Sequence, residues 1–126
     1  MTATKEPLLS SRILLVEDHE DTAAALARLL ECSGCRVKVA SSAAEALGFA
    51  ADECFDLIVC DIGLPEISGR ELMRELRQRY GLRGIALTGF AHDDIKTGGE
   101  TGFEEYLVKP IDVAQLVGAI RRVVRA

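Results

Sequence analysis

The sequence predicts an α/β fold: a doubly wound five-stranded parallel sheet in the order 2-1-3-4-5, flanked by five helices. Short apolar runs alternate with segments of helical periodicity, which is typical of parallel β/α crossovers. The chain has 126 residues, of which 48% are hydrophobic, enough for one domain with a sizeable core. Residues 1–11 are polar and unpatterned, so we expect an N-terminal tail before a domain that spans 12–126.

The first part of the chain predicts two strands and two helices. Apolar runs at 12–16 and 36–40 are short and rich in aliphatic residues, as in buried strands. Between them, 21–32 carries leucines on one face amid many alanines and is followed by a glycine, which predicts a helix. A serine followed three residues later by a glutamate forms a capping-box pattern that opens a second helix over 42–52.

The middle of the chain predicts another strand–helix–strand unit. The run 56–60 reads as a buried strand, and a glycine and a proline within 61–68 predict the loop that follows it. A helix is expected over 69–80, because its leucines fall on one stripe. The apolar run 85–88 predicts the fourth strand.

The last part predicts a weak helix, a strand and a strong helix. Two adjacent glycines lie within 92–101, and each interior glycine costs about 1 kcal/mol relative to alanine, so we expect only a short, frayed helix there. A fifth strand is expected over 105–108. The final helix is predicted over 112–125, where aliphatic residues recur at helical spacing.

Composition narrows the classes of function. The net charge of −5 argues against a broad nucleic-acid footprint, which needs clustered Lys and Arg, so no direct nucleic-acid partner is expected. No apolar run approaches the roughly 20 residues of a membrane-spanning helix, and the N-terminus lacks a secretory pattern. We therefore expect a cytoplasmic protein with no membrane partner.

The four cysteines include a C-x-x-C pair, Cys32 and Cys35, which can signal a redox or zinc site. This pair lies at the end of a helical pattern rather than at a helix N-terminus, where a thiol pKa would be lowered. We therefore interpret the pair as structural, and Cys60 as a small core residue.

Polar residues stand where the predicted strands end. In parallel α/β sheets, ligands bind at the carboxyl ends of the strands, close to the switch point between strands 1 and 3. The residues expected at this edge are Glu17, Asp18, Asp61, Thr88, Gly89, Lys109 and Pro110.

Three carboxylates at one edge predict a cation. Two carboxylates about 4 Å apart repel by roughly 4 kcal/mol at an effective dielectric near 20. An oxygen-only cluster with few ligands suits Mg²⁺, which prefers phosphate partners. Asp61 is then the candidate nucleophile, with Thr88 as a hydroxyl donor and Lys109 as a positive charge. Gly89 would let the backbone approach a phosphate oxygen closely.

Four segments together resemble the receiver domain of bacterial two-component response regulators, a flavodoxin-like phosphoacceptor domain. They are ILLVEDHEDT, DLIVCDIGLPEISG, IALTG and EEYLVKPID, and the resemblance covers residues 12–125. It implies Mg²⁺-dependent phosphorylation of Asp61 by a sensor histidine kinase or a histidine phosphotransfer protein. It also implies self-phosphorylation and autodephosphorylation only, so no enzyme acting on a separate substrate is expected.

The resemblance also assigns roles to residues. It implies that Asp18 and Asp61 bind Mg²⁺ directly, Glu17 mainly through water, and Gly63 through its carbonyl. Phosphate contacts are implied for Gly63, Gly89 and Lys109, and Thr88 and Tyr106 match the switch pair. The peptide bond between Lys109 and Pro110 is often cis in the family.

The resemblance also suggests a possible homodimer through the fourth helix, the fifth strand and the last helix. Two other functions are weighed against the phosphoacceptor function. A pseudo-receiver, which binds partners without phosphotransfer, is the alternative function. A hydrolase with an aspartyl-phosphate intermediate would need a second aspartate two positions after the nucleophile, and Gly63 stands there instead.

Overall fold

The computed structural model describes residues 11–64, 67–89 and 103–125. Five parallel strands form one sheet in the order β2-β1-β3-β4-β5, as predicted. The strands are β1 (Arg12–Val16), β2 (Arg36–Ala40), β3 (Leu57–Asp61), β4 (Gly84–Thr88) and β5 (Phe103–Val108). Among the described residues there are four helices, namely α1 (Glu20–Cys32), α2 (Ala43–Asp52), α3 (Gly69–Tyr80) and α5 (Val113–Arg125).

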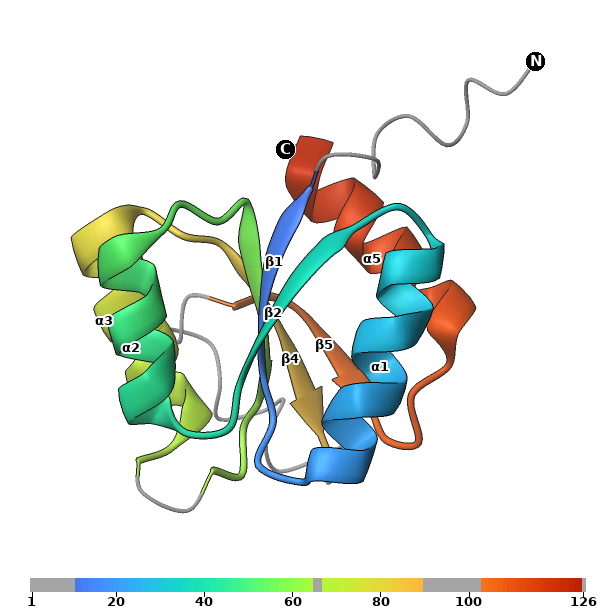
Figure 1. Ribbon diagram of the computed structural model, residues 1–126, viewed down its shortest axis with the longest axis horizontal. Helices are drawn as coiled ribbons and strands as arrows, with labels where there is room; N and C mark the ends of the chain where they lie inside the picture. The colour runs from blue at the N-terminus through green and yellow to red at the C-terminus, as the bar shows by residue number, and fades with distance from the viewer. Residues whose placement is uncertain (1–10, 65–66, 90–102, 126) are drawn as a thin grey trace.

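The helices cover both faces of the sheet. Helices α1 and α5 lie on one face and α2 and α3 on the other (Figure 1). Alternate residues of each strand enter opposite cores, so Ile13 and Leu15 face α1 and α5 while Leu14 and Val16 face α2 and α3. Burial on both sides explains why these strands are continuous apolar runs rather than alternating ones.

Local sequence signals set most of the helix ends. The Ser42 side chain caps α2 by accepting from the N–H of Glu45 at 3.1 Å, as the capping box predicts. The Glu45 carboxylate in turn accepts from the N–H of Ser41, the residue before the cap, at 2.8 Å. Gly34, just after α1, has a φ of 101°, a left-handed conformation that glycine adopts without strain.

Two strand boundaries differ from the predicted ones in ways that matter for the site. The third strand ends one residue later than expected, so Asp61 is its last residue rather than the first of the loop. The fifth strand begins at Phe103, two residues early. The predicted fourth helix, over 92–101, lies outside the described residues. No helix in the described part of the chain is long and apolar enough to cross a membrane.

Candidate functional site

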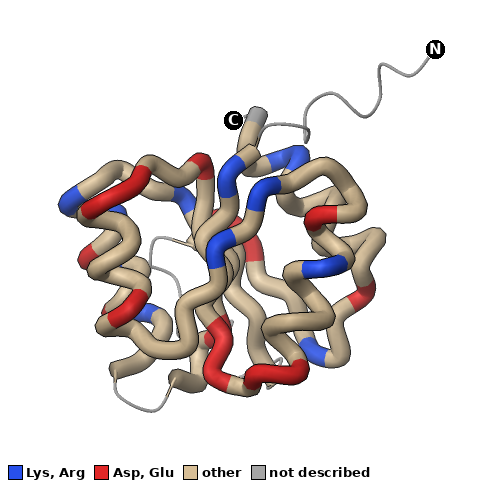
Figure 2. The backbone as a smooth tube through the Cα atoms, viewed as in Figure 1, with Lys and Arg blue, Asp and Glu red and all other residues tan. Residues whose placement is uncertain are grey.

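The predicted site residues come together at one edge of the sheet. Asp61 is the last residue of β3 and Thr88 the last of β4, while Glu17 directly follows β1 and Lys109 directly follows β5. Acidic residues gather where β1 ends and α1 begins (Figure 2). The convergence follows from topology, because the carboxyl ends of all parallel strands lie at the same edge.

The ammonium group of Lys109 links two carboxylates. Its Nζ lies 3.0 Å from Oδ2 of Asp61 and 3.5 Å from Oε1 of Glu17. The Lys109 backbone N–H also donates to the carbonyl of Thr88 at 2.7 Å, which holds the end of β5 against that of β4. Burial by itself would lower the pKa of Lys109, but the hydrogen bond and charge of Asp61, with Glu17 behind it, raise this pKa overall.

The Asp61 carboxylate is held at both of its oxygens. Oδ1 accepts from the backbone N–H of Gly63 at 2.9 Å, and Oδ2 accepts from Lys109. The residue is only 7% exposed, so these contacts hold a largely buried carboxylate in position. The N–H of Ile62 donates to the carbonyl of Leu87 at 3.0 Å, which anchors the turn behind it.

Glu17 carries the most deeply buried carboxylate of the site. Its side chain is fully buried, and Oε2 accepts from the N–H of His19 at 3.2 Å. Oε1 accepts no hydrogen bond among the described residues and has only the ammonium of Lys109 at 3.5 Å. Asp18, next to it, is partly exposed.

These donors fit a divalent cation. Three carboxylates and one ammonium leave the cluster with a formal charge of −2, and a buried carboxylate oxygen without a hydrogen bond is costly unless a positive group satisfies it. Oxygen ligands of this kind are those that Mg²⁺ prefers.

The structure also places the remaining predicted residues. Thr88 is buried, and Tyr106 is half-buried with its ring 5.8 Å from that of Phe103 in an edge-on arrangement. A Cβ at Gly63 would lie 3.7 Å from Oδ1 of Asp61, an ordinary van der Waals contact, whereas one at Gly89 would meet no atom within 4 Å.

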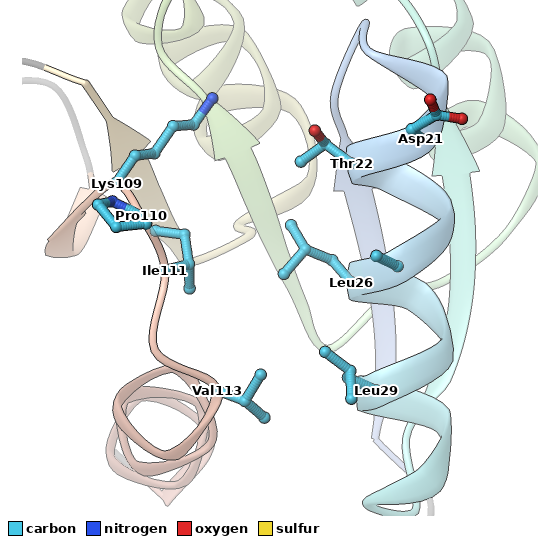
Figure 3. Close-up of a pocket in the computed structure, with 9 residues that line it drawn as sticks. Asp21, Thr22, Leu26, Leu29, Lys109, Pro110, Ile111 and Val113 are labelled. Atoms are coloured by element: carbon cyan, nitrogen blue, oxygen red, sulfur yellow. The ribbon is translucent and has the colours of Figure 1, made fainter.

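The turn after β5 has a cis peptide bond between Lys109 and Pro110. It lines a groove of about 490 Å³ between α1 and the segment that leads into α5, with Leu26 and Leu29 opposite (Figure 3). The Lys109 ammonium points away from these leucines toward the end of β3 (Figure 3). The groove is therefore apolar and lies directly beside the charged cluster.

Two residues near the site were not singled out from the sequence. Gly69 begins α3, and a Cβ there would lie 2.7 Å from the carbonyl oxygen of Asp61. The sequence showed this glycine only as the first residue of the predicted helix over 69–80, because the contact joins residues that the sequence separates. His19 is given no role by the sequence, yet its Nδ1 lies 3.4 Å from Oε2 of Glu17.

The cysteines match their structural interpretation. Cys35 is buried, and burial raises the pKa of its thiol to about 11, so this half of the C-x-x-C pair is not a reactive thiolate. Cys60 is fully buried, and burial together with the charges of Asp61 and Glu17 raises its pKa still further. All four cysteines are free thiols.

Comparisons with known proteins agree with this geometry. The family model of the response regulator receiver domain matches residues 13–121. An uncharacterized 14.6 kDa protein of Leptolyngbya boryana is 36% identical over 121 residues, covering 93% of this chain and 92% of that protein. The transcriptional regulatory protein PrrA of Mycobacterium tuberculosis is 36% identical over 118 residues, covering 92% of this chain. This chain spans about half the length of PrrA, 51%.

A solved structure shows the same fold. The response regulator protein TrrA of Thermotoga maritima, in complex with Mg²⁺-BeF, superposes with a TM-score of 0.82 at 28% identity. The superposition covers 90% of this chain and 98% of that one.

Proposed function

This chain belongs to the response regulator receiver domain family, with the phosphoacceptor role of two-component signalling, and we propose that Asp61 is the residue that accepts the phosphoryl group. The observation that carries the proposal is the placement of its carboxylate. It is buried at the end of β3, held by the Gly63 N–H at 2.9 Å and the Lys109 ammonium at 3.0 Å, beside two further acids. No other described carboxylate combines these features.

In the proposed reaction, a carboxylate oxygen of Asp61 attacks the phosphorus of a phosphohistidine on a kinase or phosphotransfer partner. A P–O bond to Asp61 forms as the P–N bond breaks, and the imidazole leaves and takes up a proton. The Gly63 N–H orients the nucleophile. The Lys109 ammonium donates a hydrogen bond to Asp61 before the reaction. From this position it can contact the phosphoryl oxygens once the phosphoryl group is attached.

We further propose that Mg²⁺ is held by the side chains of Asp18 and Asp61 and the carbonyl of Gly63, with Glu17 acting mainly through water. The unsatisfied Oε1 of Glu17 and the negative charge of the cluster support this assignment. When bound, Mg²⁺ neutralises charge on the phosphoryl oxygens and orients them for in-line transfer. The TrrA structure, which contains Mg²⁺-BeF, supports the same cofactor here.

Phosphorylation is proposed to act through Thr88 and Tyr106. Thr88 places a hydroxyl at the end of β4, one strand from Asp61, and Tyr106 is half-buried on the neighbouring β5. New charge on Asp61 would draw the hydroxyl toward it and change the packing around Tyr106. Cytoplasmic location, self-dephosphorylation and a homodimer through the β5–α5 face remain predictions, and the fourth helix of that face lies outside the described residues.

The test is labelling of the purified protein with radioactive acetyl phosphate in the presence of Mg²⁺. Asp61→Asn removes the nucleophile while keeping the size of the side chain, so label should fall below about one hundredth of the wild-type level. Asp52→Asn, which changes an exposed aspartate at the end of α2, serves as the matched control and should label normally. Chelation with EDTA should abolish labelling of the wild type. If Asp61→Asn takes up label at the wild-type level, another residue is the acceptor.

A further inference from the structure

The amino edge of the sheet, opposite the acceptor site, has two neighbouring cavities of different character. Strands β1 and β2 begin at this edge, and helices α2 and α3 end there (Figure 1). One cavity has a volume of about 110 Å³ and the other about 220 Å³. Glu53 and Phe55, which follow α2, line both cavities. The two spaces therefore lie on two sides of the same short segment.

The smaller cavity is lined by three cations and one carboxylate. Nη2 of Arg12 lies 2.6 Å from Oε1 of Glu53, and Nζ of Lys38 lies 3.1 Å from Oε2, so two cations hold the two oxygens of a single anion. Arg36 is exposed and forms no ion pair with any other described residue. Asp56 accepts from the backbone N–H of Arg12 at 2.7 Å, and with this carboxylate included the surroundings still carry one excess positive charge.

The larger cavity is mainly apolar. Its lining includes the buried side chains of Ala50 and Leu82, with the half-buried ring of Phe55. Tyr80, the last residue of α3, is 41% exposed and also lines it. Aromatic rings of this kind attract another flat ring by stacking or edge-on contact. The two volumes together reach the lower end of the range of about 300–1,000 Å³ that is typical of small-molecule sites.

We propose that the amino edge binds a small molecule in which a phosphate monoester is attached to a flat aromatic ring. The phosphate would contact Arg12, Arg36 and Lys38, because guanidinium and ammonium groups are the preferred partners of phosphate oxygens. A monoester carries nearly two negative charges at pH 7, so it competes with the single charge of Glu53 for these cations. The ring would lie across Phe55 in the apolar cavity.

This site is independent of the proposed phosphoacceptor function. Asp61 and Lys109 stand at the carboxyl ends of β3 and β5, whereas the cations of the smaller cavity stand on the first residues of β1 and β2. Binding at the amino edge therefore needs neither Mg²⁺ nor the acceptor carboxylate. The domain would bind a small molecule in addition to accepting a phosphoryl group.

The first experiment titrates the ¹⁵N-labelled protein with phenyl phosphate in EDTA, followed by NMR. Phenyl phosphate should bind at least about fivefold more tightly than inorganic phosphate or phenol alone, because one molecule fills both cavities. Arg36→Ala should weaken binding about three- to fivefold, the size of an exposed ion pair. Arg28→Ala removes an equally exposed arginine of α1, across the sheet, and should leave the affinity unchanged. Tyr80→Ala should weaken binding of phenyl phosphate about two- to tenfold and leave that of inorganic phosphate unchanged.

The second experiment locates the ligand by alkylation of cysteines with iodoacetamide, read by mass spectrometry. Cys54 lines the apolar cavity and is exposed, so saturating phenyl phosphate should slow its alkylation several-fold. Cys32, exposed at the end of α1 and outside both cavities, is the internal control and should react at an unchanged rate.

Three results would overturn the proposal. They are an affinity that Arg36→Ala leaves unchanged, equal rates of Cys54 alkylation with and without ligand, and loss of binding in Asp61→Asn, which would place the ligand at the acceptor site. Far-UV circular dichroism of each variant separates these outcomes from unfolding. Failure of Asp61→Asn to lose acetyl-phosphate labelling would count against the acceptor assignment only.

Discussion

The close approach of α3 to the acceptor strand predicts a large effect of one added methyl group. A Cβ at Gly69 would lie 2.7 Å from the carbonyl oxygen of Asp61, 2.8 Å from Cα of Ile62 and 3.2 Å from Sγ of Cys60. The two nearest atoms belong to the backbone, so they cannot rotate away as a flexible side chain can. Gly69→Ala must therefore move either the start of α3 or the end of β3.

Overpacking in a well-packed core costs typically about 1–3 kcal/mol. We expect the upper half of this range for Gly69→Ala, about 2–3 kcal/mol, because backbone must shift. With a urea m-value of about 1.5 kcal/mol/M, the unfolding midpoint should fall by about 1.3–2 M. Labelling by acetyl phosphate should slow as well, because the displaced carbonyl belongs to Asp61 itself.

The assay is urea unfolding followed by far-UV circular dichroism. Gly48→Ala is the matched control, since Gly48 lies within α2 and a Cβ there would meet no atom within 4 Å. It should stabilise the protein by about 0.5–1 kcal/mol through helix propensity. A Gly69→Ala variant with wild-type stability and labelling would refute the close contact between α3 and the acceptor strand.

Two further predictions concern the rest of the domain. Arg122 forms a bidentate ion pair with Glu105 at 2.7 Å for both contacts, and its hydrogen bonds lower the pKa of Glu105 below the ordinary 4.5. This pair therefore stabilises the fold above about pH 4.5, and the stability is lost as the pH falls through the lowered pKa. Arg122→Ala should be less stable than the wild type at pH 7 and differ less at pH 3 in thermal melts, and an equal deficit at both values would contradict the ion pair. Thiol titration should find two fast cysteines in the native protein and two more only on unfolding, whereas four fast thiols would contradict the burial of the inner pair. The exposed pair is Cys32 and Cys54, and the buried pair is Cys35 and Cys60.

The sheet could be predicted from local patterns because burial acts on each segment separately. An apolar run such as 12–16 indicates a strand that is covered on both faces, whichever strands it pairs with. The alternation of such runs with helical segments then allows few topologies, and the parallel order follows. The predicted residues at the strand ends, such as Asp61 and Lys109, came together for the same reason.

Distances between elements were not in the sequence. Asp61 and Lys109 are 48 positions apart, and their 3.0 Å contact depends on the register of β3, β4 and β5, including the irregularity near Gly84. The close approach of Gly69 to the carbonyl of Asp61 and the cis peptide bond before Pro110 likewise depend on how the elements pack. Sequence by itself determined which chemical groups reach the edge of the sheet, because residue type and strand period are local properties. Only the tertiary structure decided which groups touch, because contact depends on the position of every strand at once.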